Sequence, residues 1–182
     1  NTIASGDTIV RLLKYDLKKQ PVHFFYFFKV AFYYFLYLLH ISSFEKAKSA
    51  LLFPLDHMDN SQLKTFYENE VVPSYYPQQG YIVIVCTASC EVYMKYHQLP
   101  ADYLIGTRTL TKNGQPTSTV IGKNCKGEGK VPRILECLKS QNIEIDFENS
   151  IGYSDSTSDL PMLALVKNRK RIALKTGKIS DF

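Results

Sequence analysis

The chain has 182 residues, of which 45% are hydrophobic and 21% are charged. These shares are those of an ordinary globular domain, so they exclude intrinsically disordered and fibrous proteins. The length predicts one domain with room for a small inserted subdomain. The formal net charge is +5, but the basic residues are scattered along the chain, and we expect no nucleic-acid partner.

The four cysteines follow neither a zinc-binding spacing nor the framework of a disulfide-rich secreted protein. We therefore expect reduced thiols and a cytoplasmic location. The cysteines are Cys86, Cys90, Cys125 and Cys137.

An aromatic segment covers residues 23–41, and ten of the chain's Phe and Tyr residues lie between Phe24 and Tyr37. Its length approaches that of a membrane span. However, Lys29 and the many tyrosine hydroxyls within it disfavour the hydrocarbon centre. Three interpretations remain open: a helix buried in a subdomain, which we favour, a helix lying at the membrane interface, and a true span.

Two further helices are expected after this segment. One covers residues 44–53, with a serine at its N-cap, and the other covers residues 60–70. Pro73 and Pro77 then end the helical part of the chain.

From residue 81 the pattern changes to alternating strands and helices. Residues 81–86 form an apolar, β-branched run that is typical of a strand buried on both faces. A helix over 88–96 should pack behind it, and a strand over 103–109 should lead to a hairpin turn at Asn113-Gly114. The alternation predicts an α/β fold with ligands at the carboxyl ends of the strands. The remaining expected elements are a helix over 130–140, a strand over 150–153, a helix from residue 160 and a strand over 171–174.

Candidate chemical groups lie where these strands end. Thr87 follows the 81–86 strand, where a hydroxyl beside free helix amides can bind a phosphate oxygen. Lys130 begins a helix, where its charge could stabilise a transferring phosphoryl group. Asp155 and Asp159 at a strand-to-helix turn suit a hard cation with oxygen ligands. Taken singly, each group has a plainer interpretation as a helix cap or a surface side chain.

Together, these groups occur in an order that resembles the haloacid dehalogenase (HAD) superfamily of Mg²⁺-dependent phosphohydrolases. Residues 122–131 are similar to the Asn-Cys-x-Gly-Glu-x-Lys segment of its phosphoserine-phosphatase-like branch. Residues 152–163 are similar to its Gly-Asp-Ser-x-Ser-Asp-Leu-Pro-x-Leu segment, and residues 87–91 to its Ser-Ala-Ser-Pro-Glu. The resemblance covers nearly the whole chain. It implies a HAD-like Rossmannoid parallel sheet flanked by helices, built from residues 1–13 and 79–182, with an inserted helical cap at residues 14–78.

The resemblance also implies roles for individual residues. Asp155 would bind Mg²⁺, and Asp159 would hold a metal-bound water or Lys130. Lys130 would stabilise an aspartyl-phosphate intermediate, while Thr87 and the Ala88 amide would bind phosphoryl oxygens. The other substrate-contacting residues that it implies are Thr2, Asp7 and Ser156.

In this superfamily the nucleophile lies in the motif Asp-x-Asp-x-Thr, of which Asn1-Thr2 matches only the tail. We therefore expect both aspartates directly before Asn1. The first would attack phosphorus, and the second would act as acid and then base. If the chain starts at Asn1, the alternative is a HAD-like binding protein without turnover.

The resemblance leaves the substrate open. Phosphoserine phosphatases carry a cap arginine shortly after a Phe-Glu pair, whereas Phe44-Glu45 is followed by Ala50-Leu51-Leu52 with no arginine nearby, which argues against phosphoserine. The aromatic segment is more similar to bacterial HAD enzymes that dephosphorylate phosphatidylglycerophosphate. We therefore expect either a phospholipid headgroup, with the protein peripheral on the inner membrane, or a phosphorylated small molecule as the partner.

Overall fold

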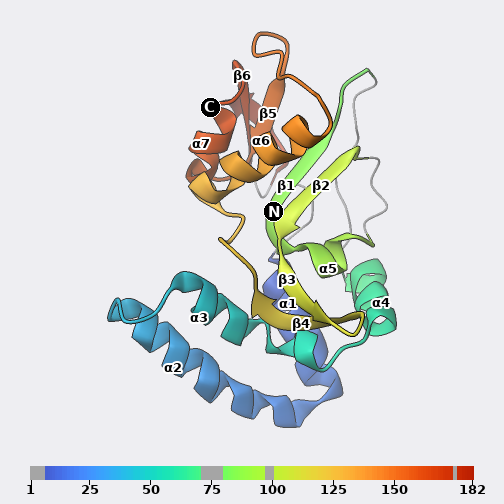
Figure 1. Cartoon of the computed structure of the whole chain (residues 1–182), viewed down its shortest axis with the longest axis vertical. Coiled ribbons are helices and arrows are strands. Elements are labelled where there is room, and N and C mark those ends of the chain that lie inside the picture. Colours follow the sequence, from blue (N-terminus) through green and yellow to red (C-terminus); the bar gives the residue numbers. More distant parts are fainter. Residues whose placement is uncertain (1–6, 71–79, 97–100, 174–175) are drawn as a thin grey trace.

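The computed structural model describes residues 7–70, 80–96, 101–173 and 176–182. Residues 8–70 form a helical region at one end of the molecule, and the parallel strands lie toward the other end (Figure 1). The helical region consists of α1 (Thr8–Lys19), a 3-10 helix (Pro21–Phe25), α2 (Tyr26–Leu38), α3 (Phe44–Leu51), a second 3-10 helix (Phe53–Asp56) and α4 (Asn60–Glu70).

Helix α1 is missing from the sequence-based prediction, although it has clear end signals. The Asp7 side chain caps it by accepting a hydrogen bond from the Ile9 amide at 2.8 Å. Lys18 and Lys19 lie in its last turn, where they interact favourably with the helix dipole. The helix runs across residue 14, so the boundary between core and cap at that position stays a prediction.

The other helices of this region lie close to their predicted positions. Helix α4 has the predicted bounds. Helix α3 begins after Ser43, whose hydroxyl accepts from the Lys46 amide at 3.4 Å. It ends at Leu51, two residues earlier than predicted, and the chain continues as the second 3-10 helix, which has Pro54 near its start.

The prediction that the aromatic segment forms a buried helix is wrong. Helix α2 has no buried residue. Its inner side packs on α3 and the second 3-10 helix, where the Tyr26 and Phe53 rings stack at 5.0 Å, but its outer side is uncovered in the described part of the chain (Figure 1). None of the described helices is long and apolar enough to cross a membrane. The exposed large apolar residues between positions 22 and 41 are Val22, Phe24, Phe25, Phe28, Phe32, Tyr34, Phe35, Leu38, Leu39 and Ile41.

The second half of the chain alternates strands with helices. Strand β1 (Ile84–Cys90) pairs in parallel with β2 (Tyr103–Thr107). Strands β3 (Thr109–Lys112) and β4 (Gln115–Val120) form the hairpin predicted at Asn113-Gly114. Strand β5 (Ile151–Ser154) pairs in parallel with β6 (Asn168–Ile172), and β6 pairs antiparallel with β7 (Ile179–Asp181). In the described residues, the two parallel pairs belong to separate sheets. The helices are α5 (Glu91–Met94), α6 (Lys130–Ser140), with the predicted bounds, and α7 (Leu160–Leu163).

Strand β1 differs from the prediction at both ends. It begins three residues later than expected and continues to Cys90, because pairing with β2 extends as far as Thr107. The helix predicted over 88–96 is therefore wrong in its first part, α5 is short, and residues 97–100 lie outside the described residues. The strand is also not buried on both faces, since Val85 is buried while its two neighbours are half-buried.

Within β1 the ladder is interrupted by a bulge. Cys86 is opposite Ile105 and Cys90 is opposite Thr107, so Thr87, Ala88 and Ser89 face a single residue of β2, Gly106. A Cβ atom on Gly106 would lie 2.7 Å from the Ser89 carbonyl oxygen. The bulge therefore needs glycine at this position of β2.

Two apolar cores hold these parts together. One joins the helical region to α5, and the other lies between β2 and α6. The fully buried members of the first include Leu12, Leu52, Leu55, Leu63, Phe66 and Tyr93, and the second contains Ile105, Cys125, Ile134 and Leu138.

We predict that Gly106→Ala destabilises the fold, because the added methyl group must displace the backbone of the bulge. The free energy of unfolding, measured by urea denaturation, should fall by about 1–3 kcal/mol. Thr119→Ala, on the exposed side of β4, is the control and should change it by less than about 0.5 kcal/mol. Equal stability of the Gly106 variant and the wild type would contradict the close approach.

Candidate functional site

A buried ion pair lies between the start of α6 and the turn before α7. The Lys130 ammonium donates to Asp159 Oδ2 at 2.7 Å, and both side chains are buried. The same Oδ2 atom accepts a hydrogen bond from the Ser154 hydroxyl at 2.8 Å. The structure thus brings two of the predicted residues together and adds Ser154, at the end of β5, which the sequence did not single out.

Local backbone geometry positions this pair. Lys130 follows a 3-10 turn (Gly127–Gly129), and a Cβ atom on Gly129 would clash with the Asn124 carbonyl oxygen. Glycine therefore lets the loop 122–126 pack under the start of α6. Asp159 lies in a second 3-10 turn (Thr157–Asp159), whose N-cap Ser156 accepts from the Ser158 amide at 3.2 Å.

Asp155 and Ser156, the two other predicted residues of this turn, lie between Ser154 and Asp159 in the sequence. Asp155 is half-buried directly after β5, which ends at Ser154. The Ser156 amide donates to the Ser154 hydroxyl at 3.1 Å, so the turn folds back on the end of the strand. Asp155 is thus presented at the carboxyl edge of β5, where ligands of α/β proteins commonly bind.

The predicted phosphate-binding residues lie in the bulge of β1. The sequence predicts that Thr87 follows the strand, whereas the structure places Thr87 within it. Its hydroxyl accepts from the Ser89 amide at 3.1 Å. The Ser89 hydroxyl lies 2.7 Å from that of Thr8, the first residue of α1. The N-terminus of α1, with Asp7 at its cap, therefore lies next to the bulge, whereas Thr2 lies outside the described residues.

Two thiols lie close together beside the bulge, one of them from the residue that precedes it. Cys86 Sγ is 3.6 Å from Cys125 Sγ, and both cysteines are free. The hydrogen bond with Cys125 and burial raise the pKa of Cys86, and the charges of Lys130 and Asp159 also act on it. Burial raises the pKa of Cys90, at the end of the strand, to about 11. Cys86 and Cys90 are therefore protonated at neutral pH.

A polar network that the sequence analysis missed lies behind the bulge. The Thr107 hydroxyl lies 2.8 Å from the Ala88 carbonyl oxygen and 2.9 Å from Asn124 Oδ1. The Lys48 ammonium, from α3, is within hydrogen-bonding distance of the same two oxygens and of the Thr107 hydroxyl. Asn124 lies in the quoted motif, but Lys48 gives little sequence signal beyond its place between two small residues, Ala47 and Ser49.

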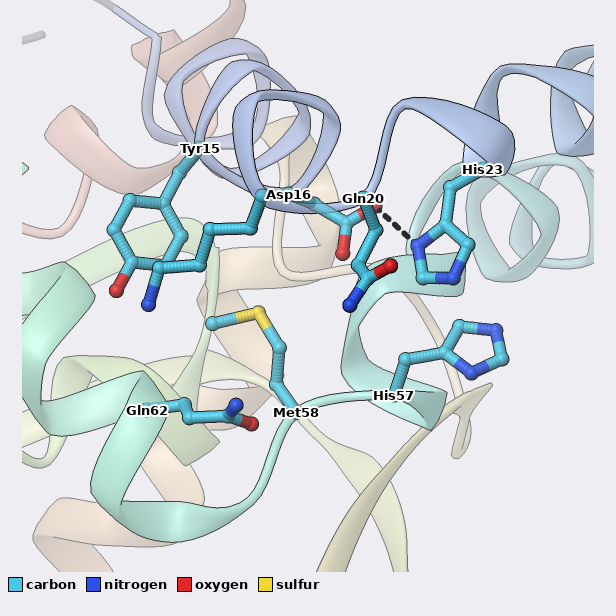
Figure 2. A pocket seen from close by; sticks show the side chains of 8 residues that line it. Tyr15, Asp16, Gln20, His23, His57, Met58 and Gln62 are labelled. Carbon is cyan, nitrogen blue, oxygen red and sulfur yellow. Dashed lines mark hydrogen bonds and ion pairs between the residues drawn. The ribbon is translucent and has the colours of Figure 1, made fainter.

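A separate small pocket lies within the helical region (Figure 2). Asp16 is buried there and pairs with His23 Nδ1 at 2.9 Å, and the His23 ring lies 4.5 Å from that of His57. None of the predicted site residues lines it. The complete lining is Tyr15, Asp16, Lys19, Gln20, His23, His57, Met58 and Gln62.

Across the residues that the structure describes, no group of three or more acidic, histidine or cysteine side chains could hold a metal ion. Of the residues predicted for the metal, the structure describes one, Asp155. Mg²⁺ typically binds proteins through one or two carboxylates together with water and substrate phosphate. The oxygen-rich turn around Asp155 is compatible with this chemistry, provided that further ligands come from outside the described residues.

Comparison with known proteins places this arrangement in context. The model of the haloacid dehalogenase-like hydrolase family matches residues 1–164. No curated protein matches the chain.

Several solved structures share the fold. A protein of unknown function from Bordetella pertussis Tohama I is 23% identical with a TM-score of 0.61, over 74% of this chain and 68% of that chain. A probable phosphoserine phosphatase from Vibrio cholerae is 20% identical with a TM-score of 0.53, and the match covers 75% of this chain and 45% of that chain. A phospho-aspartyl intermediate analogue of phosphoserine phosphatase is 16% identical with a TM-score of 0.58, over 91% of this chain and 79% of that one. The α/β fold class predicted from the sequence is confirmed.

We predict that Asp159→Ala lowers the free energy of unfolding by about 3–5 kcal/mol, because it leaves the Lys130 ammonium buried without a carboxylate. Asp181→Ala, which removes an exposed partner of Lys170, is the control and should cost less than about 1 kcal/mol. Replacing both members, by Lys130→Met with Asp159→Leu, should recover part of the lost stability. Urea denaturation of the four proteins measures this. Equal losses in the Asp159 and Asp181 variants would contradict a buried pair.

Proposed function

Because the chain belongs to the haloacid dehalogenase-like hydrolase family, we propose that it is a Mg²⁺-dependent phosphatase that hydrolyses a phosphomonoester through an aspartyl-phosphate intermediate. The observation that carries this proposal is the buried Lys130–Asp159 pair beside Asp155 at the end of β5. The nucleophilic aspartate and the acid–base aspartate are expected directly before Asn1. In this proposal, residues 14–78 form the cap over the core made by residues 1–13 and 79–182.

Each described site residue then has a chemical task. Thr87 and the Ala88 amide bind phosphoryl oxygens from the bulge, and Lys130 stabilises the negative charge that accumulates on the phosphoryl group in the transition state. Asp159 holds the Lys130 ammonium in place through a hydrogen bond of 2.7 Å. Asp7, Ser156 and Thr2 would contact the remainder of the substrate.

Asp155 is the residue that would bind Mg²⁺, with carboxylates from before Asn1. When bound, the ion neutralises phosphate charge and aligns the phosphorus for in-line attack. The Ser154 hydroxyl and the Ser156 amide hold the turn that carries Asp155.

A phospholipid phosphate such as phosphatidylglycerophosphate is the substrate class that we propose, with the protein at the surface of an anionic membrane. The support is the outer side of the segment 22–41, where Phe28 is 70% exposed and Ile41 is 69% exposed. An exposed apolar area of this kind is rare on a monomer and suits a membrane interface.

The charges around this segment support the same partner. No acidic residue occurs between Asp16 and Glu45, whereas Lys18, Lys19 and Lys29 are exposed within that stretch. Lysines at the edge of an apolar face are attracted to anionic lipid, each contributing about 1 kcal/mol near the surface. A second copy of the chain would instead bring lysines against lysines. A phosphorylated small molecule remains the alternative substrate, and the experiments below distinguish the two.

We predict that the protein, with the residues that precede Asn1, releases phosphate from phosphatidylglycerophosphate in a Mg²⁺-dependent reaction. Asp155→Asn should lower kcat on the order of 100-fold, because it removes a ligand of the ion. Asp181→Asn is the matched control on an exposed strand and should keep full activity. Phosphate release with and without EDTA, compared among the lipid, phosphoserine and p-nitrophenyl phosphate, is the measurement. Faster hydrolysis of the two soluble esters would favour a small-molecule substrate, and no hydrolysis of any ester would overturn the phosphatase proposal.

We also predict that the protein binds vesicles of phosphatidylglycerol and not those of phosphatidylcholine. The triple variant Phe28→Ser, Phe32→Ser, Phe35→Ser removes three exposed rings from α2 and should lower the vesicle partition coefficient about tenfold or more. Phe147→Ser removes an exposed ring elsewhere, at 46% exposure, and should leave it unchanged. Co-sedimentation measures both. Wild-type protein that stays in the supernatant with every vesicle would exclude the membrane proposal without affecting the phosphatase proposal.

A further inference from the structure

Lys48 is a buried cation that no family motif explains. It lies in α3, in the helical region, and is 5% exposed. Its ammonium group donates to the Ala88 carbonyl oxygen at 2.6 Å, to the Thr107 hydroxyl at 3.1 Å and to Asn124 Oδ1. These acceptors match its three N–H bonds, and they come from β1, from β2 and from the loop 122–126.

All three acceptors are neutral. In the described part of the chain, Lys48 forms no ion pair with a carboxylate, in contrast to Lys130. Its charge is therefore buried without a carboxylate in direct contact, which is unfavourable unless an anion comes near. Burial lowers the pKa of Lys48, as expected for an ammonium group whose charge is incompletely compensated.

The Lys48 ammonium lies next to the proposed phosphate site, in contact with Ala88. Lys48 binds the carbonyl of Ala88, the residue whose amide is proposed to bind a phosphoryl oxygen. The Ala88 carbonyl and the Ser89 amide belong to one peptide group, so the lysine also holds the part of the bulge that carries the Ser89–Thr87 hydrogen bond. A change at Lys48 must therefore alter the orientation or the electrostatics of the bulge.

Two neighbours of Lys48 on α3, Glu45 and Ser49, also form hydrogen bonds with the strand half of the chain. Glu45 Oε1 accepts from the Asn124 amide at 3.2 Å, and the Ser49 hydroxyl accepts from the Val120 amide at 3.0 Å. Residues 45, 48 and 49 share one face of the helix, because they are three and four positions apart. This face fixes α3 to the end of β4 and to the loop 122–126, and Lys48 extends the contact to the bulge.

We propose that Lys48 is a positioning residue for phosphate binding: it orients the Thr87–Ser89 bulge through the Ala88 carbonyl and supplies the positive charge that the helical region contributes to a bound phosphate. The proposal rests on the proposed function, because it needs the bulge to be the phosphate site. It assigns to Lys48 the electrostatic contribution of a cap cation in a chain that has no arginine shortly after Phe44-Glu45. The ligand class is a tetrahedral oxyanion.

The test compares inorganic phosphate binding, in the presence of Mg²⁺, to the full chain and its variants by isothermal titration calorimetry. Lys48→Met keeps most of the length of the side chain and removes the charge, and Lys46→Met is the exposed control two residues away on the same helix. We expect the dissociation constant for phosphate to rise about tenfold or more for the Lys48 variant. The control should match the wild type. Circular dichroism checks that each variant is folded.

A second measurement follows the dissociation constant as the pH rises. The charged or titratable groups that act on Lys48 are Cys90, Cys125, Asp7 and Lys126. Since the pKa of Lys48 is lowered, the wild type should lose phosphate affinity at a pH below that at which an exposed lysine loses its proton. Lys48→Arg keeps its charge throughout this range, so its affinity should lack this alkaline step.

These outcomes separate the two proposals. Wild-type protein that binds no phosphate overturns the proposed function and with it the role of Lys48. A folded Lys48→Met variant that binds phosphate as the wild type does overturns the role of Lys48 alone. If Lys48→Met does not fold, the Arg variant decides: an alkaline step at the same pH as in the wild type would overturn the proposal.

Discussion

The burial of two ammonium groups is the constraint on which the rest of this structure depends. Lys130 is neutralised by Asp159, whereas Lys48 is surrounded by neutral oxygens. A buried charge is destabilising unless its hydrogen bonds are made. The segments that supply the acceptors, which are the β1 bulge, the end of β2, the loop 122–126 and the turn after β5, therefore have little freedom to move. The same contacts that stabilise the fold set the geometry of the proposed site.

Apolar packing and polar contacts contribute differently to holding the helical region against the strands. The apolar core that contains Leu12, Phe66 and Tyr93 brings the two parts together, but apolar contact is non-directional and permits small sliding movements. The hydrogen bonds of Glu45, Lys48 and Ser49 are directional and fix the register of α3 against the loop and the bulge. Because of this division, a change in a few polar side chains can alter the proposed site without disrupting the fold.

The elements that depend on local sequence signals were predicted correctly. The features that depend on partners distant in the sequence were missed. Helices α4 and α6 and the Asn113-Gly114 hairpin were found because their periodicity and turn residues are local. The helix expected over 88–96 was wrong because pairing with β2 continues the strand to Cys90. The aromatic segment was expected to be a buried helix because Lys29 and the tyrosine hydroxyls disfavour a membrane span, but only its inner side has neighbours. Lys48 was missed because its acceptors lie 40, 59 and 76 positions further along the chain. The ion pair of Lys130 was anticipated only through the family resemblance.

The exposed aromatic helix and the buried lysine belong to one packed unit, which connects the two proposals. Helix α2 contacts α3 through the rings of Tyr37 and Phe44, at 5.5 Å, and α3 carries Lys48. If vesicle binding shifts α2 against α3, the shift reaches the Ala88 carbonyl through a chain of direct contacts. Binding free energies are linked reciprocally. A vesicle that tightens phosphate binding by some factor must therefore have its own binding tightened by phosphate by the same factor. Equal phosphate affinity with and without vesicles would mean that the two surfaces act independently, with α3 holding its position while α2 is occupied.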